Sequence, residues 1–315
     1  MLFDLNVPWP SNNYATTPTS QQITTLLNTI TTLGTLGYTH IAINFTLSEN
    51  VRIPSNQQDI NPIQIEMVKD YFKDNFPRLK LFTRLTLVIN DPSQCQGLSK
   101  VQNSFDLIAV QPTSEKGLQL ATTNLDIDLI SFNMASKLPF FLKHKTIGSA
   151  LEKGIRFEIC YSPMISGPAG YSIQTANDNM SLSKTALLVR KYFFSNVLQL
   201  IRASRSKGLI VSSGATQPLQ VRNLSDILIL LKTLGLDNSR AKSCVTDNPE
   251  KVLVNGRLKI KSYKQTIAVG NDNGKSDILY NNDGEDNVKK TDSAGYKKKL
   301  SDSSGGNLLK KQRVK

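Results

Sequence analysis

The sequence is poor in the residues that hold transition metals and form disulfide bonds. Its 315 residues include only two histidines, His40 and His144, and three cysteines, Cys95, Cys160 and Cys244. The histidines are too far apart for an HxH or HExxH motif, and the cysteines are odd in number with no CxxC pair. These shortages exclude the usual zinc sites and a disulfide framework, and they favour a reducing compartment.

Long apolar runs and acidic residues are also scarce. No stretch of about 20 apolar residues is present to span a bilayer. The N-terminal sequence MLFDLNVPWP has neither the basic start nor the apolar core of a signal peptide. Acidic residues number 25 against 38 lysines and arginines, which gives a net charge of +13. This balance favours a polyanionic partner, with nucleic acid as the first candidate and a membrane surface as the second.

What the sequence does contain is an alternation of short β-type runs and longer helical ones. The predicted strands cover residues 3–7, 38–45, 79–90, 105–110, 127–133, 155–161 and 209–213. The predicted helices cover residues 20–36, 63–76, 94–103, a short segment after Pro112, 147–153, 182–206, 224–234 and 239–245. Alternation of this kind predicts a parallel sheet with helices outside it.

The number of units and their length favour an α/β fold in which a single domain, residues 1–255, forms a TIM-like (β/α) barrel. An open, doubly wound sheet is the competing fold, because periodicity does not distinguish the two. After Gly256 large aliphatic residues thin out, and residues 256–315 are predicted to form a disordered, Lys-rich tail. Basic clusters at 297–299 and 310–313 are typical of nuclear-import or nucleic-acid contacts, or of a merely solubilising tail.

The predicted carboxyl ends of the strands, where the catalytic groups of such barrels project, carry no acids. The residues at these ends are Asn6, Asn44, Asn90, Gln111, Asn133, Tyr161 and Ser213. Five of these seven are neutral amides, which have no proton to exchange near neutral pH and are poor ligands for transition metals. The sequence therefore predicts neither a catalytic residue nor a metal site at this end of the barrel.

Charged residues do occur inside the predicted strands. Asp4 and Glu158 alternate with large apolar residues, which predicts that both carboxylates face the barrel interior. Arg84 and Arg156 fall on the corresponding face of their strands. A buried ion-pair network is the favoured interpretation, because buried charges must be paired and an adjacent arginine makes a carboxylate a poor proton carrier. An acid/base pair in the barrel mouth is the alternative.

The most informative charge pattern is a stretch without acids. No carboxylate lies between Asp178 and Asp226. The same stretch contains seven candidate contacts for RNA, namely Lys184, Arg190, Lys191, Arg202, Arg205, Lys207 and Arg222. On a helix that advances about 100° per residue, four of these cations fall within a sector of about 60°. These four are Lys184, Lys191, Arg202 and Arg205.

The other side of this predicted helix is apolar. It carries Leu187, Val189, Phe193, Val197, Leu200 and Ile201, and Phe194 is also expected to pack in the core. An uncompensated basic stripe opposite an apolar face predicts RNA binding through phosphates. No signature of a module that reads RNA sequence accompanies it. An incidental basic surface and an acidic protein partner are the alternatives.

A set of short motifs resembles a known family. Residues 157–163, FEICYSP, resemble the F-E-I-x-Y-x-P segment of the barrel-shaped, thirty-kilodalton-class protein subunit of eukaryotic and archaeal ribonuclease P. The neighbours follow in the same order. They are FDLN at 3–6, the long helix, LIVSSGA at 209–215, Arg222, Asp226, LGL at 234–236, Ala241-Lys242 and Asn248-Pro249. The resemblance covers most of residues 1–255 and leaves the tail outside.

The resemblance implies a barrel related to metal-dependent phosphoesterases that has lost their metal ligands. It implies a chain with no catalytic residue and no cofactor of its own, in a nuclear and nucleolar complex without a membrane partner. The partners would be ribonuclease P RNA, ribonuclease MRP RNA and other protein subunits, including a small ferredoxin-like one. The RNA and its Mg²⁺ would then cleave precursor tRNA, the substrate of the complex, at the 5′ leader, and the MRP complex would process rRNA. The alternative is an autonomous phosphoesterase of the related barrel family that uses Asp4 and Glu158.

Overall fold

The computed structural model of the chain describes residues 1–48, 53–54, 56, 60–91, 101, 103–166, 182–263 and 267–268. These residues belong to one compact unit, Met1–Asn281. The helix predicted over residues 94–103 lies almost wholly outside the described residues. So does most of the predicted tail, including both of its basic clusters.

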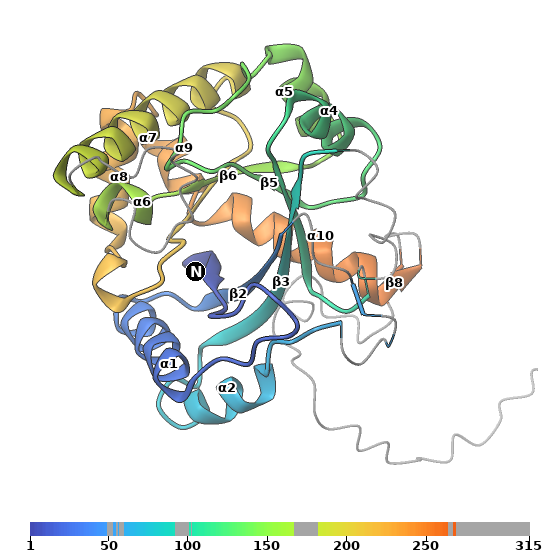
Figure 1. The fold of residues 1–315 in the computed structure, drawn as a ribbon, viewed down its shortest axis with the longest axis vertical. Coiled ribbons are helices and arrows are strands. Elements are labelled where there is room, and N and C mark those ends of the chain that lie inside the picture. The colour runs from blue at the N-terminus through green and yellow to red at the C-terminus, as the bar shows by residue number, and fades with distance from the viewer. Residues whose placement is uncertain are drawn as a thin grey trace, which may run out of the picture. The chain divides into compact units, whose positions relative to one another are not determined.

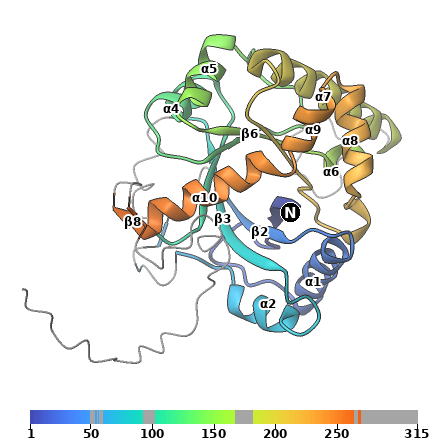
Figure 2. The same ribbon diagram turned by 180° about the vertical axis from the view of Figure 1, so that it is seen from behind.

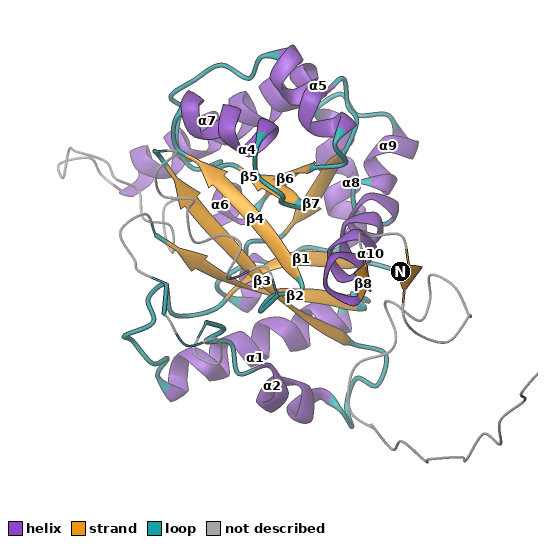
Figure 3. Ribbon diagram, turned by 90° about the vertical axis from the view of Figure 1, so that its right-hand side faces the viewer, coloured by secondary structure: helices purple, strands orange, loops and turns teal. Residues whose placement is uncertain are grey.

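Seven parallel strands form the centre of the molecule, in the order β1 to β7 (Figure 1). Their bounds are Phe3–Pro8 (β1), His40–Leu47 (β2), Lys80–Ile89 (β3), Leu107–Pro112 (β4), Leu129–Ser131 (β5), Arg156–Cys160 (β6) and Leu209–Ser212 (β7). Each strand pairs with the next one along the chain. The sheet curls into a nearly closed barrel, as Figure 3 shows. The predicted barrel is confirmed, and the open sheet is excluded.

The gap between β1 and β7 is closed by hydrogen bonds from neighbouring segments. Gly214 N, just after β7, donates to Asn6 O at 2.9 Å. At the other end of the gap, Phe3 N donates to Val245 O at 3.4 Å and Val211 N to Cys244 O at 3.1 Å. The segment at Cys244–Val245 thus takes part of the place that an eighth strand would have in a fully closed barrel.

Helices lie outside the sheet (Figures 1 and 3). Their bounds are Ser20–Thr35 (α1), Ile65–Phe72 (α2), Glu115–Thr123 (α4), His144–Glu152 (α5), Ser162–Ser166 (α6), Leu182–Ser204 (α7), Leu224–Thr233 (α8), Asn238–Ser243 (α9) and Asp247–Lys261 (α10). A 3-10 turn, η3, covers Pro218–Gln220, and two short strands, β8 (Ser262–Tyr263) and β9 (Ile267–Ala268), pair with each other. No helix in these described ranges is long and apolar enough to cross a membrane.

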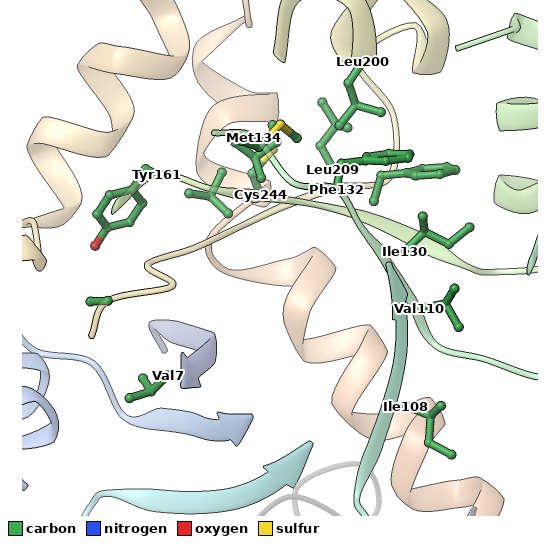
Figure 4. Close-up of a cluster of buried hydrophobic side chains, with 14 of the residues drawn as sticks. Val7, Ile108, Val110, Ile130, Phe132, Met134, Tyr161, Leu200, Leu209 and Cys244 are labelled. Carbon is green, nitrogen blue, oxygen red and sulfur yellow. The ribbon is translucent and has the colours of Figure 1, made fainter. Parts of the chain in front are cut away.

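The strands bury both of their faces, and two hydrophobic clusters result. The outer cluster lies between the sheet and the helices, and Figure 4 shows part of it, including Ile108, Val110, Ile130 and Leu200. The inner cluster fills the barrel and consists of Phe3, Leu5, Ala42, Phe82, Leu107, Ala109, Leu129 and Ile210 with Val252 and Leu253 of α10. Because successive side chains in a strand point to opposite faces, a strand buried on both sides needs the continuous apolar runs seen in the sequence.

The signals at the ends of α1 act as its sequence predicts. Thr19 and Gln22 form a capping box at the N-terminus. Gly37, just past the helix, has a φ of 88°, which a residue with a side chain adopts only at a cost. Gly34 lies inside the helix, one residue before its end. A Cβ there would come within 2.9 Å of the Phe76 ring, so the glycine permits close packing of α1 on the segment after α2.

Helix α10 corrects the predicted domain boundary. The boundary at residue 255 falls inside this helix, which continues to Lys261 and crosses one end of the barrel (Figures 1 and 2). Gly256 is buried so closely that a Cβ would lie 2.6 Å from Asp106 O. The Arg257 guanidinium lies 5.6 Å from the centre of the Phe82 ring. The sequence predicted no helix after residue 245, so the whole of α10 was missed, and contacts with the barrel stabilise its polar last turns.

Candidate functional site

The barrel interior holds a buried ion pair between Arg84 of β3 and Glu158 of β6. The side chains of both residues are wholly buried. Arg84 Nη1 lies 2.5 Å from Glu158 Oε1, and Arg84 Nη2 lies 2.7 Å from Oε2, so the contact is bidentate. Arg84 Nη1 also donates to Leu5 O at 2.7 Å. The structure therefore brings together two of the four charges that the sequence placed in the interior, as an ion pair.

Amide and hydroxyl side chains complete this interior network. Asn6 Nδ2 donates to Glu158 Oε2 at 3.1 Å, and Asn44 Nδ2 donates to Asn6 Oδ1 at 2.8 Å. Thr86 Oγ1 donates to Asn44 Oδ1 at 2.7 Å and accepts from Arg84 Nε at 3.2 Å. Two of the five predicted strand-end amides thus meet inside the barrel, where they connect the ion pair across β1, β2 and β3. A network in which each polar group finds a partner rigidifies a buried site.

The electrostatics of the pair oppose proton transfer. Burial alone would raise the pKa of Glu158, but the Arg84 guanidinium outweighs this effect and holds the pKa below its ordinary value. Burial likewise acts to lower the pKa of Arg84, and the Glu158 carboxylate raises it overall. A carboxylate with a lowered pKa stays ionised near neutral pH and is a poor general acid or base. Both of its oxygens are also engaged, so the arrangement does not suit a bound metal cation.

Asp4 lies elsewhere than the alternation predicted. It stands between Phe3 and Leu5, which both belong to the inner cluster, so it does not share their face. Its Oδ1 accepts hydrogen bonds from Ser213 N and Asn6 N, each at 3.1 Å, at the gap between β1 and β7. A shift of register between Asp4 and Val7 interrupts the alternation, which is why Asn6 and not Asp4 meets Glu158. Burial raises the pKa of Asp4 to about 6.

The fourth predicted interior charge, Arg156, is half-buried at the start of β6. It lies two residues before Glu158 and so shares its face of the strand. Burial lowers the pKa of Arg156. Its Nε is buried without a hydrogen-bond partner in the part of the chain that the structure describes. The structure does not join Arg156 to the Arg84–Glu158 pair.

Three of the other predicted strand-end residues accept hydrogen bonds from backbone amides. Asn133 Oδ1 accepts from Ala135 N at 3.0 Å, and Ser213 Oγ accepts from Ala215 N at 3.2 Å. The Tyr161 hydroxyl accepts from Arg222 N at 3.1 Å. Within the described ranges there is no group of three or more His, Cys, Asp or Glu side chains that could hold a metal ion.

Helix α7 presents part of the predicted basic stripe to solvent. Arg190, Lys191 and Arg202 are exposed, while the opposite residues Val189, Phe193 and Val197 are buried. Asn196 Nδ2 donates to Ser136 O at 2.7 Å and fixes the inner side of the helix to the segment before α5. The side chain of Lys184 lies outside the described part of the structure.

Three residues of α7 and its end depart from the prediction. Leu187 is 63% exposed and Phe194 is 37% exposed, so neither is a core residue. Arg205 lies beyond the end of α7 at Ser204 and has a left-handed φ of 52°, so its direction does not follow the helical period. The helix therefore buries a narrower stripe than predicted.

A compact basic surface lies at the C-terminal end of α7, and the sequence analysis named only part of it. Arg202, Arg205 and Lys207 are exposed there. Arg240 Nη1 of α9 lies 3.5 Å from Arg205 O, which brings the exposed Arg240 to this corner, and the exposed Lys242 follows two residues later on the same short helix. The two α9 cations were missed because 35 residues separate Arg240 from Arg205 in the chain. We call Arg202, Arg205, Lys207, Arg240 and Lys242 the basic corner.

Arg222, the last of the seven predicted contacts, serves a local role. Its Nη1 donates to Leu219 O and to Val221 O, both at 2.8 Å, around the 3-10 turn. Its backbone links two buried tyrosines, because Arg222 O accepts from the Tyr38 hydroxyl at 3.3 Å and Arg222 N donates to Tyr161. The structure does not bring Arg222 into the basic corner.

Comparisons with known proteins agree with one another. The family model described as RNase P subunit p30 matches residues 1–261, which end at the last residue of α10. The chain is 45% identical over 283 residues to the ribonuclease P/MRP protein subunit RPP1 of Saccharomyces cerevisiae, with 89% of each chain covered. It is 28% identical over 237 residues to the ribonuclease P protein subunit p30 of Mus musculus, and this match covers 74% of this chain and 81% of the mouse protein.

A solved structure shares the fold. A chain in the cryo-EM structure of archaeal ribonuclease P with mature tRNA superposes with a TM-score of 0.55 at 14% identity. The match covers 86% of this chain and 99% of the archaeal one. At this level of identity the likeness shows a common barrel and no more.

Proposed function

Because the chain belongs to the RNase P subunit p30 family, we propose that it is a protein subunit of ribonuclease P and ribonuclease MRP that supports the 5′ maturation of precursor tRNA and the processing of rRNA without performing the cleavage. The observation that carries the non-catalytic part is the Arg84–Glu158 pair. A guanidinium occupies the centre of the barrel and engages both carboxylate oxygens that an acid/base or metal mechanism would need. The family matches favour a subunit and not the autonomous phosphoesterase.

RNA association is proposed for the basic corner. Its five cations project from the C-terminal end of α7, the following turn and α9. Cations that neutralise phosphates release counterions, and this release makes binding tighter at low salt. Lys184, Arg190, Lys191 and Arg222, predicted from the sequence, would then lie at or beyond the margin of the contact.

The test of this surface is charge reversal. A variant with Arg202→Glu, Arg205→Glu and Arg240→Glu is expected to recover less ribonuclease P RNA in affinity purification, and its RNA binding should depend less steeply on salt. A matched control reverses three exposed cations on other parts of the barrel, Lys73, Arg78 and Lys116. Equal RNA recovery and equal salt slopes for the two variants would contradict the assignment.

Chemistry is proposed to belong to the RNA and its bound Mg²⁺, with no cofactor on this chain. The purified, RNA-free protein is expected to leave precursor tRNA intact in the presence of Mg²⁺. Cleavage by the RNA-free protein that Asp4→Asn abolishes would overturn this proposal and restore the phosphoesterase.

The remaining partners and the location are proposed from the family. Other protein subunits, including a small ferredoxin-like one, ribonuclease MRP RNA and a nuclear, nucleolar location are all consistent with membership. The basic cluster at 310–313 is the proposed import signal. A fluorescent fusion that lacks residues 310–313 should stay in the cytoplasm, and nuclear accumulation of that fusion would assign import to another segment.

A further inference from the structure

The outward face of α7 carries apolar side chains beside its cations. Leu187 is 63% exposed, Phe194 is 37% exposed, and Leu198 is half-buried. At about 100° per residue, these three positions fall within about 40° of one another and form one line along the helix. The inner face of α7 is already packed on the barrel, and Leu198 also packs in part against the outer cluster. Leu187 and Phe194 are the residues of this line that the described part of the chain leaves exposed, and they form a second apolar stripe.

The spacing of this stripe is that of a helix–helix seam. Leu187, Lys191, Phe194 and Leu198 follow one another at intervals of four, three and four residues, the a/d pattern of coiled coils. We call these four residues the α7 seam. A charged residue at one seam position selects the partner and the register at some cost in stability. Lys191 is the charged residue of the α7 seam, and the exposed Arg190 lies next to it.

The seam is held in a fixed position before any partner binds. The Phe193 ring packs edge-on against the Phe194 ring, with 5.6 Å between their centres. Arg190 Nε donates to Met164 O at 3.1 Å, which ties this flank of the helix to α6. A surface that is ordered in advance loses less entropy on binding and supports tighter association.

The charge of the helix restricts what can cover the seam. No acidic residue lies between Asp178 and Asp226, so a second copy of α7 in a two-fold contact would place cations against cations. RNA phosphates would neutralise Arg190 and Lys191 but would leave Leu187 and Phe194 in water. A helix with an apolar stripe and carboxylates beside it satisfies both sets of side chains.

We propose that the α7 seam docks an acidic amphipathic helix of another protein subunit of the same complex. The apolar side chains of that helix would cover Leu187 and Phe194, and its carboxylates would face Lys191 and Arg190. This inference rests on the proposed function, since it places the chain in a multi-subunit particle. It assigns α7 a protein partner along its middle part, residues 187–198, and leaves the RNA contact at the basic corner.

The direct test is site-specific crosslinking in the intact complex. Phe194 is replaced by p-benzoyl-L-phenylalanine in the full-length chain, the complex is purified and irradiated, and the product is digested with nuclease and protease and mapped by mass spectrometry. The expected product joins position 194 to an acidic helical segment of a protein subunit. The control places the same amino acid at Ile229, which is 63% exposed on α8. A product with RNA, or no product beyond that of the control, would overturn the proposal.

A second test uses variants whose side chains are exposed, so that folding is preserved. Leu187→Ser with Phe194→Ser is expected to lower the amount of the crosslinked subunit in the purified complex about tenfold, while the RNA remains. Ile229→Ser is the matched control and should retain the subunit. Lys191→Glu should also release it, and reversal of the facing acid in the partner should restore it. Unchanged retention in the seam variants would refute the docking site.

The two proposals fail in different ways. If the proposed function is wrong, the unmodified chain does not recover ribonuclease P RNA. If only the docking proposal is wrong, the RNA is recovered with every protein, and the seam variants retain the same subunits as the Ile229→Ser control.

Discussion

At the scale of single residues, the Arg84 guanidinium determines what chemistry the interior of the barrel can perform. Arg84 gives four hydrogen bonds, two to Glu158 and one each to Leu5 O and Thr86. A guanidinium in this position has the charge of a cation but offers no open coordination site. The same two oxygens of Glu158 that could bind a metal or move a proton are therefore committed to a structural role.

Removal of one partner of the Arg84–Glu158 pair is predicted to destabilise the fold, because the other partner then stays buried without its counter-charge. Arg84→Met or Glu158→Leu alone leaves the charge of the other residue buried and unpaired and should lower the free energy of unfolding by about 3–5 kcal/mol. The double change Arg84→Met with Glu158→Leu should cost clearly less than the sum of the two. Urea unfolding of the four proteins measures this cycle. Additive losses, or single losses below about 1 kcal/mol, would show that the pair is not coupled in the buried state.

The buried Asp4 carboxyl should make the protein less stable as the pH rises, whereas an ordinary salt-bridged acid makes a protein more stable. Burial raises its pKa from 3.8 to about 6, so its contribution is fully present below pH 3.8 and is lost as the pH rises through 6. Asp4→Asn keeps an oxygen for Ser213 N and Asn6 N. As the pH rises from 4 to 7, the free energy of unfolding of Asp4→Asn should therefore increase relative to that of the parent by up to about 3 kcal/mol.

The measurement is urea unfolding of both proteins across this range, with the exposed Asp74→Asn change as the control. A constant difference between the Asp4 variant and the parent would show that the buried carboxylate does not titrate in this window.

At the scale of elements, α10 links the chain end to the base of the barrel. Lys259 Nζ lies 2.7 Å from Asp126 Oδ1 and 2.9 Å from Asp128 Oδ1. Asp128 is buried, and its Oδ2 accepts from Ile108 N at 2.9 Å, so Asp128 connects the lysine to β4. Burial raises the pKa of Asp128, and Lys259 opposes that rise. The helix therefore closes the barrel by packing and compensates a buried charge.

Truncation tests the role of α10. A chain that ends after Asn255 lacks the Lys259 contacts and the Arg257 side chain over Phe82, and it should lose about 2–4 kcal/mol of the free energy of unfolding. A chain that ends after Ala268 keeps all of these contacts and should match the full-length protein. Equal urea midpoints for the shorter and the longer chain would show that the domain does end at residue 255.

At the scale of the whole molecule, the interior of the barrel is closed, and the proposed binding surfaces lie outside it. Its interior is closed by the Arg84 network near the carboxyl ends of the strands and by α10 at the other end. The α7 seam lies on the outside along the middle of one long helix, and the basic corner lies at the C-terminal end of that helix and on α9. A fold that hosts catalysis at strand ends in many enzymes here has both proposed binding surfaces on its helical exterior.

The sequence by itself determined what depends on local order. The seven strands were predicted within a few residues, because runs buried on both faces need continuous apolar residues. The Arg84 and Glu158 side chains were placed on the interior face by the period of two. The absence of acids from residues 179–225 is likewise a property of the chain alone.

Only the tertiary structure decided what depends on contacts between distant segments. Phe3 and Leu5 of β1 face the interior and so turn Asp4 away from it, and barrel packing made a helix of residues 256–261 against their composition. The fold also brought Arg240 to Arg205 and left Leu187 and Phe194 uncovered. Periodicity records which side of a segment is apolar. Whether another segment covers that side depends on the arrangement of the whole barrel, and the same pattern is compatible with a covered or an open face.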